Sequence, residues 1–325
     1  MLKVAVTGCG LISTKNHIPT FLKAADKVKI VAVCDLNEEA VKNVAKKFNI
    51  PGVYTDFSDM LKKEKPDILD ICTPPQTHAK LAVEALKSGC DVLLEKPMAL
   101  KLEDCEAIVA CANENKKQVC VVHNQIFNPA FLKAKAMLDK GEIGDFVGMD
   151  IFLSTPTDYI TSKENHWAHK LPGGILGETG PHPAYLASAF LNDIYEAKVE
   201  ARKFLNQYPW SIGEDFRINL LAKNGFCSTV LFYGSNQWAA DLSIYGTEGY
   251  LRIDLQAQTV VKYKRPALKS SCMAKSVFSC AFQMLGGIFS AAARYSLKKN
   301  YNAHEIGIKM FIDSLVKGEK TPVTA

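Results

Sequence analysis

The order of apolar and amphipathic stretches over the first 122 residues constrains the fold more than any other feature of this sequence. Short β-branched runs alternate there with amphipathic segments. A parallel sheet whose strands are joined by crossover helices requires this order. The pattern predicts an α/β Rossmann domain, a doubly wound parallel sheet, over residues 1–122. The predicted strands are Lys3–Val6, Lys29–Cys34, Ile68–Cys72, Val92–Leu94 and Val119–Val122, with helices over 37–48 and 77–88 among the connections.

The pattern changes after residue 122. A helix is predicted over 130–140 and a strand over 146–153, and a helical stretch follows a glycine-rich turn near residue 180. From residue 195 to 254, strand-like segments follow one another at hairpin spacing without helices between them, which predicts an antiparallel sheet. We therefore expect residues 123–325 to form an α+β domain with a large, mainly antiparallel sheet that binds substrate and supports oligomerisation.

Composition limits the classes of function. The chain has 325 residues, 48% of them hydrophobic, which suits two ordinary domains. Its ten cysteines form no CxxC pair, which predicts core cysteines in a reducing compartment and no metal site. The net charge of +5 is spread along the chain, which disfavours nucleic-acid binding. The N-terminus lacks the pattern of a signal peptide, so we expect a cytoplasmic protein.

Residues 276–299 are apolar and end in basic residues. The unbroken apolar stretch is shorter than the ~20 residues of a spanning helix, and it contains a glutamine and two adjacent glycines. These features favour a buried or interface-forming helical pair. Attachment to a membrane surface is the alternative, and we expect no membrane contact on this pattern alone.

The stretch "VAVTGCGLIS" places Gly8 and Gly10 directly after the first strand, and Leu11 and Ile12 begin the next helix. In a dinucleotide-binding turn the first glycine permits the tight bend and the second lets the backbone approach a pyrophosphate at a helix N-terminus. Ser13 stands where a third glycine is usual. A glycine turn that binds nothing is the alternative for this motif taken alone.

Asp35 ends the second predicted strand, where a carboxylate can accept hydrogen bonds from a ribose 2′-hydroxyl. A 2′-phosphate would be repelled by roughly 4 kcal/mol at ~4 Å and an effective dielectric of ~20. Neither Leu36 nor Asn37 is a cation that could offset this repulsion. The sequence therefore predicts NAD as the cofactor in preference to NADP.

The stretch "DVLLEKPMAL" ends a buried strand in Glu95, Lys96 and Pro97. Ligands of open α/β sheets bind beyond the carboxyl ends of the strands, so Glu95 and Lys96 should share an edge with Gly8 and Asp35 and contact the cofactor. Solvated charges at a strand end are the alternative. Pro97 argues against it, because a proline restricts the preceding residue and can adopt the cis form, which would fix the direction of Lys96.

Three motifs together resemble the Gfo/Idh/MocA family of oxidoreductases, which includes glucose-fructose oxidoreductases and inositol 2-dehydrogenases. They are "EKP" at the end of a buried strand, the stretch "CTPPQTHAKLAVEALKSGCDVLLEKP" that leads into it, and "GGILGETGPHP" in the second domain. The similarity runs from Val4 to about Pro322. The resemblance implies that Lys96 and His182 face each other across a nicotinamide, with an acid four residues before the histidine. That acid is usually Asp in the family and is Glu178 here, whose carboxylate lies one methylene farther from the backbone.

The residue types suit this chemistry independently of the resemblance. Oxidation of a secondary alcohol needs a base for the hydroxyl proton, and histidine titrates near neutral pH. A positioned lysine can stabilise negative charge on the substrate oxygen. For His182 taken alone, a satisfied core histidine is the alternative.

The resemblance also implies cofactor contacts from Thr73, Pro74 and His78, although a helix-capping role stays open for His78. Asn124 follows the last predicted strand, Val119–Val122, and is expected to reach nicotinamide or substrate. Trp167 could form a wall against a sugar ring or could simply pack within the second domain; the sequence leaves both open.

The sequence predicts an NAD-dependent dehydrogenase that moves hydride between nicotinamide and a hydroxyl or keto carbon of a polyol, sugar or nucleotide sugar. The alternatives are an NAD-recycling glycosidase, a reductase of imines or tetrapyrroles, and a non-catalytic dinucleotide-binding regulator. The resemblance implies a homodimer or homotetramer.

Overall fold

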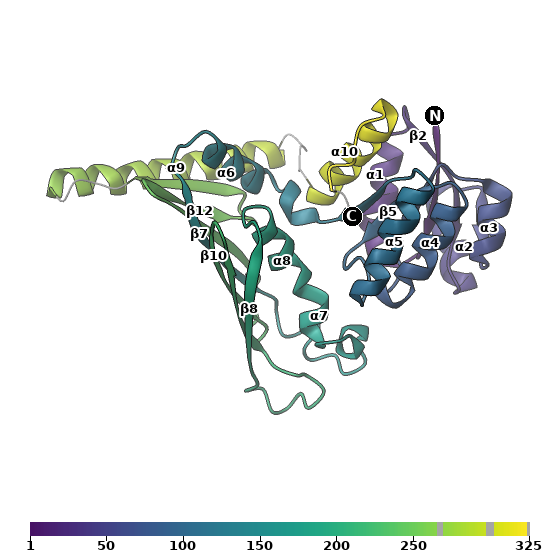
Figure 1. The fold of residues 1–325 in the computed structure, drawn as a ribbon, viewed down its shortest axis with the longest axis horizontal. Coiled ribbons are helices and arrows are strands. Elements are labelled where there is room, and N and C mark those ends of the chain that lie inside the picture. The colour runs from purple at the N-terminus through teal and green to yellow at the C-terminus, as the bar shows by residue number, and fades with distance from the viewer. Residues whose placement is uncertain (265–268, 297–301, 324–325) are drawn as a thin grey trace. The chain divides into compact units, whose positions relative to one another are not determined.

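The chain forms two compact units (Figure 1). The computed structural model describes residues 1–264, 269–296 and 302–323. The first unit combines Met1–Asn124 with the chain from Asn302 onward, and the second unit is Gln125–Tyr301.

The first unit alternates strands and helices as the sequence predicts, with observed strand ends within one residue of the predicted ones. Its elements are β1 (Leu2–Thr7), the π-helical turn η1 (Ser13–His17), α1 (Ile18–Lys23), β2 (Val28–Cys34), α2 (Glu38–Phe48), β3 (Gly52–Tyr54), α3 (Phe57–Glu64), β4 (Ile68–Ile71), the 3₁₀ turn η2 (Pro75–Thr77), α4 (His78–Lys87), β5 (Asp91–Glu95), α5 (Leu102–Glu114), β6 (Val119–Val122) and α10 (Ala303–Lys317).

The six strands form one parallel sheet in the order β3-β2-β1-β4-β5-β6. Val4 of β1 pairs with Ile30 on one side and Ile68 on the other. The chain order reverses beside β1, and in open α/β sheets ligands bind at such a point, beyond the carboxyl ends of the strands. The predicted doubly wound sheet is confirmed, and the short strand β3 adds an edge that the sequence did not indicate.

Helix α2 shows how local sequence sets these boundaries. Asn37 caps its N-terminus by accepting a hydrogen bond from the backbone N–H of Ala40. Asn49 ends the helix in the left-handed conformation, which asparagine tolerates better than most residues. Val41 and Val44 point from the helix into the core. The predicted helix therefore begins and ends where its caps require.

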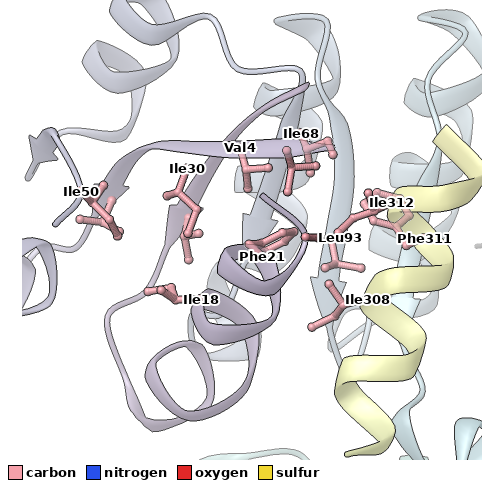
Figure 2. Close-up of a cluster of buried hydrophobic side chains, with 14 of the residues drawn as sticks. Val4, Ile18, Phe21, Ile30, Ile50, Ile68, Leu93, Ile308, Phe311 and Ile312 are labelled. Atoms are coloured by element: carbon pink, nitrogen blue, oxygen red, sulfur yellow. The ribbon is translucent and has the colours of Figure 1, made fainter. Parts of the chain in front are cut away.

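The C-terminal helix α10 belongs to the first unit. Its Ile308, Phe311 and Ile312 have no exposed surface and pack in one cluster with residues such as Phe21 and Leu93 (Figure 2). The sequence-based boundary assigned this segment to the second domain. The structure differs because the apolar face of α10 finds its partners on the sheet of the first unit.

The second unit contains the predicted helices and strands and some further elements. They are the 3₁₀ turn η3 (Asn124–Phe127), which starts at the last residue of the first unit, then α6 (Pro129–Asp139), β7 (Phe146–Ser154), the 3₁₀ turn η4 (Trp167–Lys170), α7 (Ile175–Thr179), α8 (Pro181–Ser188), β8 (Ile194–Arg202), β9 (Asp215–Ala222), β10 (Gly225–Phe232), β11 (Ala239–Gly246), β12 (Gly249–Asp254), β13 (Thr259–Lys264) and α9 (Ser270–Ser296).

The strands of this unit form one sheet in the order β13-β12-β11-β7-β10-β9-β8. The pair β7 and β10 is parallel, and the other neighbouring pairs are antiparallel, so the sheet is mainly antiparallel as predicted. One face of the sheet carries the core, where Phe131 of α6 and Leu186 of α8 pack against Ile151 and Ile244. The helices α6 and α8 thus cover this face (Figure 1).

The apolar stretch near residue 280 is a single helix, α9, and not the helical pair that the sequence favoured. Residues 270–290 of α9 are long and apolar enough to cross a membrane by length and composition, with a mean hydropathy of 1.3. Within that stretch Cys280 is buried, whereas the large apolar side chains are exposed. The adjacent glycines, Gly286 and Gly287, lie within the helix without breaking it.

Candidate cofactor and substrate sites

The turn after β1 requires glycine at one position and leaves open space at the other. Gly8 has a φ of +94°, and a Cβ atom there would lie 2.6 Å from the backbone carbonyl carbon of Cys72. At Gly10, by contrast, a Cβ would meet nothing within 4 Å. The turn therefore packs against the end of β4 and presents an uncovered backbone beside Gly10, as pyrophosphate binding requires.

Ser13 replaces the usual third glycine without disturbing the packing. Its side chain is fully buried, and its hydroxyl donates a hydrogen bond of 3.0 Å to the carbonyl oxygen of Gly10. Leu11 is 62% exposed and Ile12 is partly buried, so both lie at the rim of the turn. The first helical turn is π-helical over Ser13–His17, which directs His17 into the core.

Asp35 lies at the end of β2, where its two carboxylate oxygens are held by backbone N–H groups. Oδ2 accepts from the N–H of Cys9 at 2.7 Å, and Oδ1 accepts from the N–H of Asn37 at 2.9 Å. Each carboxylate oxygen can accept more than one hydrogen bond, so both retain capacity for ribose hydroxyls. The partly buried carboxylate is fixed in place at the edge where the sequence expected it.

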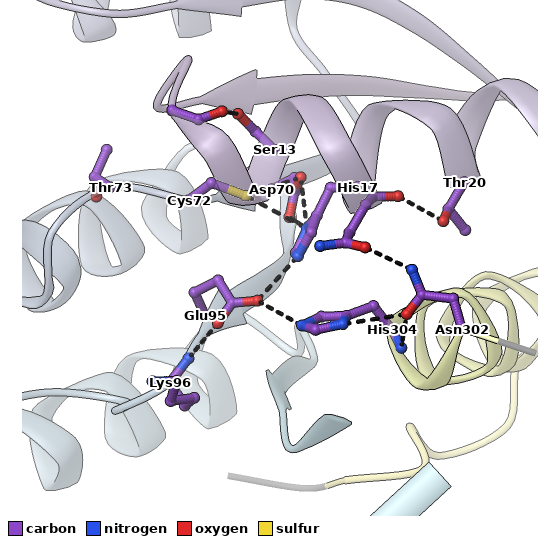
Figure 3. Close-up of polar contacts among 12 residues, drawn as sticks. Ser13, His17, Thr20, Asp70, Cys72, Thr73, Glu95, Lys96, Asn302 and His304 are labelled. Atoms are coloured by element: carbon purple, nitrogen blue, oxygen red, sulfur yellow. Dashed lines mark hydrogen bonds and ion pairs between the residues drawn. The ribbon is translucent and has the colours of Figure 1, made fainter. Parts of the chain in front are cut away.

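Glu95 of the EKP motif takes part in a buried ion cluster (Figure 3). His17 is enclosed between two carboxylates: its Nδ1 donates to Asp70 at 2.9 Å and its Nε2 donates to Glu95 at 3.0 Å. All three side chains are almost fully buried. Ligand atoms of His17, Asp70 and Cys72 lie within 4.8 Å of one another, as a metal site would need. Because carboxylates occupy both ring nitrogens, we interpret the cluster as an imidazolium held by two anions.

The pKa shifts agree with this interpretation. Burial favours the neutral ring of His17, but the nearby Asp70 raises its pKa well above the usual value. Burial likewise opposes ionisation of Glu95, yet the hydrogen bond and the charge of His17 lower its pKa to about 2. His304 of α10 has its Nε2 3.9 Å from Oε1 of Glu95, and burial lowers its pKa to about 4. Glu95 is therefore a permanent anion at neutral pH.

The cluster holds the end of β5 that carries Lys96. The backbone N–H of Lys96 donates to Oε2 of Glu95 at 3.1 Å. The carboxylate of Glu95, itself held by His17, therefore fixes the backbone of the candidate catalytic lysine. The peptide bond between Lys96 and Pro97 is cis, as the sequence allowed. Glu95 was expected among the cofactor contacts, but its side chain is 7% exposed and faces His17.

His78 links the EKP motif to the loop after β4. Its Nδ1 lies 2.8 Å from the carbonyl oxygen of Pro97, and its Nε2 lies 2.9 Å from that of Thr73. Burial lowers the pKa of His78, so the ring is neutral and only one of these nitrogens donates at a time. The side chain has no exposed surface, whereas Pro74 is exposed and Thr73 is partly buried. His78 thus supports the loop that the exposed residues present.

In the second unit, a glycine turn brings the backbone close to the start of α7 and α8. A Cβ at Gly177 would lie 2.4 Å from the carbonyl oxygen of Pro172, so only glycine fits. Glu178 lies on α7 and His182 in the first turn of α8. Nδ1 of His182 lies 2.6 Å from the hydroxyl of Tyr185, which fixes the ring from one side.

Glu178 and His182 line a cavity of about 380 Å³ in this unit. Tyr159 and Trp238 form an aromatic corner of the cavity, with ring centroids 5.0 Å apart and an edge-to-face angle of 68°. The remaining lining residues are Gln125, Asn128, Leu153, Ser154, Thr155, Thr179, Leu231, Tyr233, Ala239, Ala240, Leu255 and Gln256. A lining that combines several polar groups with aromatic rings suits a polyhydroxylated ligand.

The tryptophan that lines the cavity is Trp238, for which the sequence predicted no role. Trp167 is not part of the cavity lining; its ring stacks on His166 at 5.5 Å and is 39% exposed. Trp238 provides the cavity wall instead. Sequence reasoning also missed Tyr233, whose hydroxyl is hydrogen-bonded to that of Thr179. Burial, with a smaller effect from Glu178, raises the pKa of Tyr233, so its hydroxyl stays protonated.

Asn124 ends the first unit, at the start of η3 directly after β6, where the sequence placed it. The preceding His123 is largely buried, and burial lowers its pKa to about 4. Lys96 and Asn124 thus belong to the first unit, and Glu178 and His182 belong to the second.

A Rossmann-type sheet with this glycine turn, joined to an α+β unit with an acid and a histidine in a cavity, defines the chain as an NAD-binding oxidoreductase. Comparison with known families agrees. Residues 2–123 match the model of the oxidoreductase family with an NAD-binding Rossmann fold, and residues 131–252 match the Gfo/Idh/MocA C-terminal domain. The chain belongs to the Gfo/Idh/MocA family of oxidoreductases.

Individual relatives share moderate identity with most of the chain. Oxidoreductase P35 of Formosa agariphila is 26% identical over 82% of this chain and 83% of its own length. D-apiose dehydrogenase of Paraburkholderia graminis is 28% identical over 77% of this chain and 67% of its own length. The WlbA dehydrogenase of Bordetella pertussis, solved with NADH and UDP-GlcNAcA, has the same fold, with a TM-score of 0.78 and 20% identity over 99% of this chain and 89% of its own.

Proposed function

We propose that this protein is a dehydrogenase that oxidises a secondary alcohol, or reduces the corresponding ketone, on a polyol, sugar or nucleotide sugar. The observation that carries the proposal is the cavity of the second unit, because it is lined by the acid and histidine that the sequence singled out. The names of relatives that act on D-apiose or bind UDP-GlcNAcA support a polyhydroxylated substrate.

The residues of the first unit fit NAD. The uncovered backbone at Gly10 leaves room for a pyrophosphate, and the fixed carboxylate of Asp35 suits a ribose diol. When bound, NAD accepts hydride from the substrate carbon or returns it. We propose that Lys96 and His182 both act on the oxygen that this carbon carries. Nε2 of His182 takes the hydroxyl proton, and the ammonium group of Lys96 stabilises the negative charge that develops on the oxygen.

Glu178 lies one turn before His182 and lines the same cavity. In our proposal its carboxylate orients substrate hydroxyls and favours the protonated form of His182 after proton transfer. The hydroxyl of Tyr185 holds the ring at Nδ1, so that proton transfer takes place at Nε2. This division of roles resembles other base-and-orienter arrangements in enzymes.

The first test is a screen of inositols, aldoses and UDP- or GDP-sugars with NAD, followed by absorbance near ~340 nm. For the active substrate, Lys96→Ala should lower kcat by at least ~100-fold, the lower range for a positioned charge-stabilising group. Lys101→Ala is the matched control, because Lys101 is exposed and lies in the same connection after β5. NAD binding measured by calorimetry should persist in both variants and should stay within about twofold of the wild type for Lys101→Ala. Equal kcat in the two variants would remove Lys96 from the mechanism.

An NAD-recycling glycosidase would use the same hydride step with a different net result. It would cleave a glycoside without accumulating NADH, whereas a dehydrogenase produces one NADH for each substrate oxidised. Measuring NADH against product therefore distinguishes the two. A non-catalytic regulator would bind NAD and turn over no substrate in the screen.

The preference for NAD over NADP is a separate proposal that rests on Asp35. Like charges at ~4 Å cost roughly 4 kcal/mol at an effective dielectric of ~20, so a 2′-phosphate should be rejected strongly. Asp35→Ser should lower the ratio of the NADP Kd to the NAD Kd by at least about tenfold. Asp26→Ser, in the loop before β2, is the control. An unchanged ratio in Asp35→Ser would show that the preference resides elsewhere.

A further inference from the structure

Helix α9 turns its polar face toward the protein and its apolar face away from it, which is the reverse of a helix in a water-soluble domain. Among the side chains of α9 that the structure describes, the less exposed ones are small or polar: Cys272, Ser276, Cys280, Gln283 and Gly287. They recur every three or four residues and so form one stripe. The side turned away from the protein carries the large apolar side chains. Amphipathic helices of soluble proteins normally bury the apolar face instead.

The contacts with β13 show that this orientation is specific. Oε1 of Gln283 accepts from the backbone N–H of Lys262 at 2.8 Å, and its Nε2 donates to the carbonyl oxygen of Lys262 at 3.1 Å. A Cβ at Gly287 would lie 2.9 Å from Cγ2 of Thr259, so the helix approaches the strand closely there. Since β13 is at the edge of the sheet, α9 covers otherwise unpaired backbone groups.

The outer face of α9 is broad and apolar. At 3.6 residues per turn its large apolar side chains cover about half of the helix circumference. Phe282 and Phe289 are each 71% exposed, and Phe278 is 66% exposed. A monomeric soluble protein rarely leaves such a patch uncovered. Among the side chains that the structure describes, this face consists of Met273, Val277, Phe278, Phe282, Met284, Leu285, Ile288 and Phe289.

The charge of this part of the chain points to an anionic occupant. Residues 255–304 contain eight of the 39 Lys and Arg residues and none of the 34 Asp and Glu residues. Without this stretch the net charge of +5 would become −3, so the positive charge is concentrated around α9. Lys264, Lys269 and Lys275 are exposed, close to the start of the helix. Basic residues flanking an apolar helix are typical of binding to anionic lipid.

The topology excludes one way of meeting a bilayer. If α9 crossed the membrane once, α10 would lie on the opposite side from residues 1–264. However, Phe311 and Ile312 of α10 are fully buried in the core of the first unit, together with Phe21 and Leu93. A single crossing would break that core. The helix can therefore lie in the plane of a membrane surface but cannot span it while the first unit stays folded.

We propose that α9 attaches this protein to the surface of membranes that contain anionic lipids. The apolar half of the helix enters the boundary between headgroups and acyl chains, and the flanking lysines contact lipid phosphates. A second copy of the chain is the competing occupant. We favour lipid because the exposed sector is wider than the seam of a helix pair, and because residues 255–304 contain no acid that could pair with a partner's lysines.

Vesicle co-sedimentation tests the apolar face. The full-length protein should sediment with vesicles of equimolar phosphatidylcholine and phosphatidylglycerol, and much less with phosphatidylcholine alone. The double variant Phe282→Ser and Phe289→Ser should lower the partition coefficient at least about tenfold. The matched control is Tyr195→Ser with Val199→Ser, two similarly exposed apolar residues on β8, which should stay within about twofold. Circular-dichroism melting should show that both double variants are folded.

A charge variant tests the electrostatic part. Lys269→Gln with Lys275→Gln should weaken binding to the anionic vesicles by about tenfold or more, since each basic residue near such a surface contributes roughly fivefold. High salt should remove this difference. Lys46→Gln with Lys62→Gln, two exposed lysines on α2 and α3, is the control and should bind like the wild type.

Three outcomes would overturn the proposal. The wild type could fail to sediment with either kind of vesicle. The apolar and control variants could lose binding equally. Finally, ultracentrifugation without lipid could show an oligomer that Phe282→Ser with Phe289→Ser dissociates, while vesicle binding is absent; a second copy would then be the occupant. NAD binding does not enter any of these measurements, so a failure here is separable from a failure of the proposed enzyme activity.

Discussion

The two C-terminal helices, α9 and α10, use similar residues in opposite ways. In α10 the apolar residues Ile308, Phe311 and Ile312 face the sheet of the first unit and have no exposed surface. In α9, Phe282 and Phe289 face away from the protein while Gln283 faces the sheet. The two helices show that an apolar composition does not by itself decide which face of a helix packs against the protein.

The polar contacts of the two helices differ in the same sense. Helix α10 has ion pairs to α1 and to the segment after it, through Glu305 with Lys23 and Asp313 with Lys27, and its His304 lies beside the buried Glu95. Helix α9 reaches the rest of its unit chiefly through small side chains and one glutamine. We conclude that α10 stabilises the first unit, whereas the sequence of α9 is adapted to an external surface.

Truncation of one phenylalanine on each helix gives the largest expected contrast. Phe311→Ala should lower the free energy of unfolding by about 3–5 kcal/mol, because it removes buried apolar contacts and leaves a cavity in the core of the first unit. Phe282→Ala should change it by no more than about 0.5 kcal/mol, as for other exposed positions. Urea unfolding monitored by circular dichroism measures both. A cost for Phe282→Ala close to that for Phe311→Ala would break the contrast.

The pH dependence of the unfolding free energy should report the protonation of His304 at the start of α10. Burial lowers the pKa of His304 from 6.5 to about 4, so the unfolded chain binds a proton first as the pH falls. Its contribution to stability is present above pH ~6.5 and is lost on acidification, by about 2 kcal/mol between pH 7 and pH 5. Glu95, with its pKa of about 2, stays ionised in the native state over this window.

His304→Gln should flatten this pH dependence by a similar amount in urea titrations at pH 7 and pH 5. The buried His123, whose pKa is also lowered to about 4, shifts stability in the same direction and should preserve part of the slope. Phe282→Ala is the control, because α9 carries no histidine. If the unfolding free energy of His304→Gln depended on pH as strongly as that of the wild type, the inference that this ring is neutral in the native state would be wrong.

The strands were predicted closely because buried strands are continuous apolar runs whose ends are marked by polar or glycine residues. The placement of α10 was not predicted. An amphipathic pattern shows that one face of a helix is buried but does not show which part of the protein that face packs against. For α9, Gly286 and Gly287 suggested a break between two helices. The structure shows that Gly287 instead allows close approach to Thr259, a contact between distant segments that no local pattern encodes.

The same distinction applies to the candidate sites. Gly8, Asp35, Glu178 and His182 were identifiable because each lies in a motif with a fixed local context. Trp238 was not, since it lies before β11 without a motif and reaches the cavity only through the fold of the sheet.

The buried partner of Glu95 left a fainter signal in the sequence. Asp70 stands alone in the otherwise apolar strand β4, and a buried carboxylate requires a partner. His17, in the first helical turn after Gly10, was the available cation. A search of the sequence for charged residues within apolar strands would therefore have pointed to Asp70 and to His17 as its partner.

The exposed ion pairs of α10 should have the smallest effect. Oε2 of Glu305 lies 2.5 Å from Nζ of Lys23, and Oε1 lies 2.6 Å from Nζ of Lys309. Lys23 is 58% exposed, so solvent and salt screen the attraction, and Glu305→Gln should cost only about 0.5–1 kcal/mol at low salt. Melting temperatures with and without added salt measure this loss, and the difference should shrink as salt increases. Glu38→Gln, which removes the exposed pair with Lys42 on α2, provides the comparison. A salt-independent loss as large as that of Phe311→Ala would mean that α10 is held by charge more than by its apolar face.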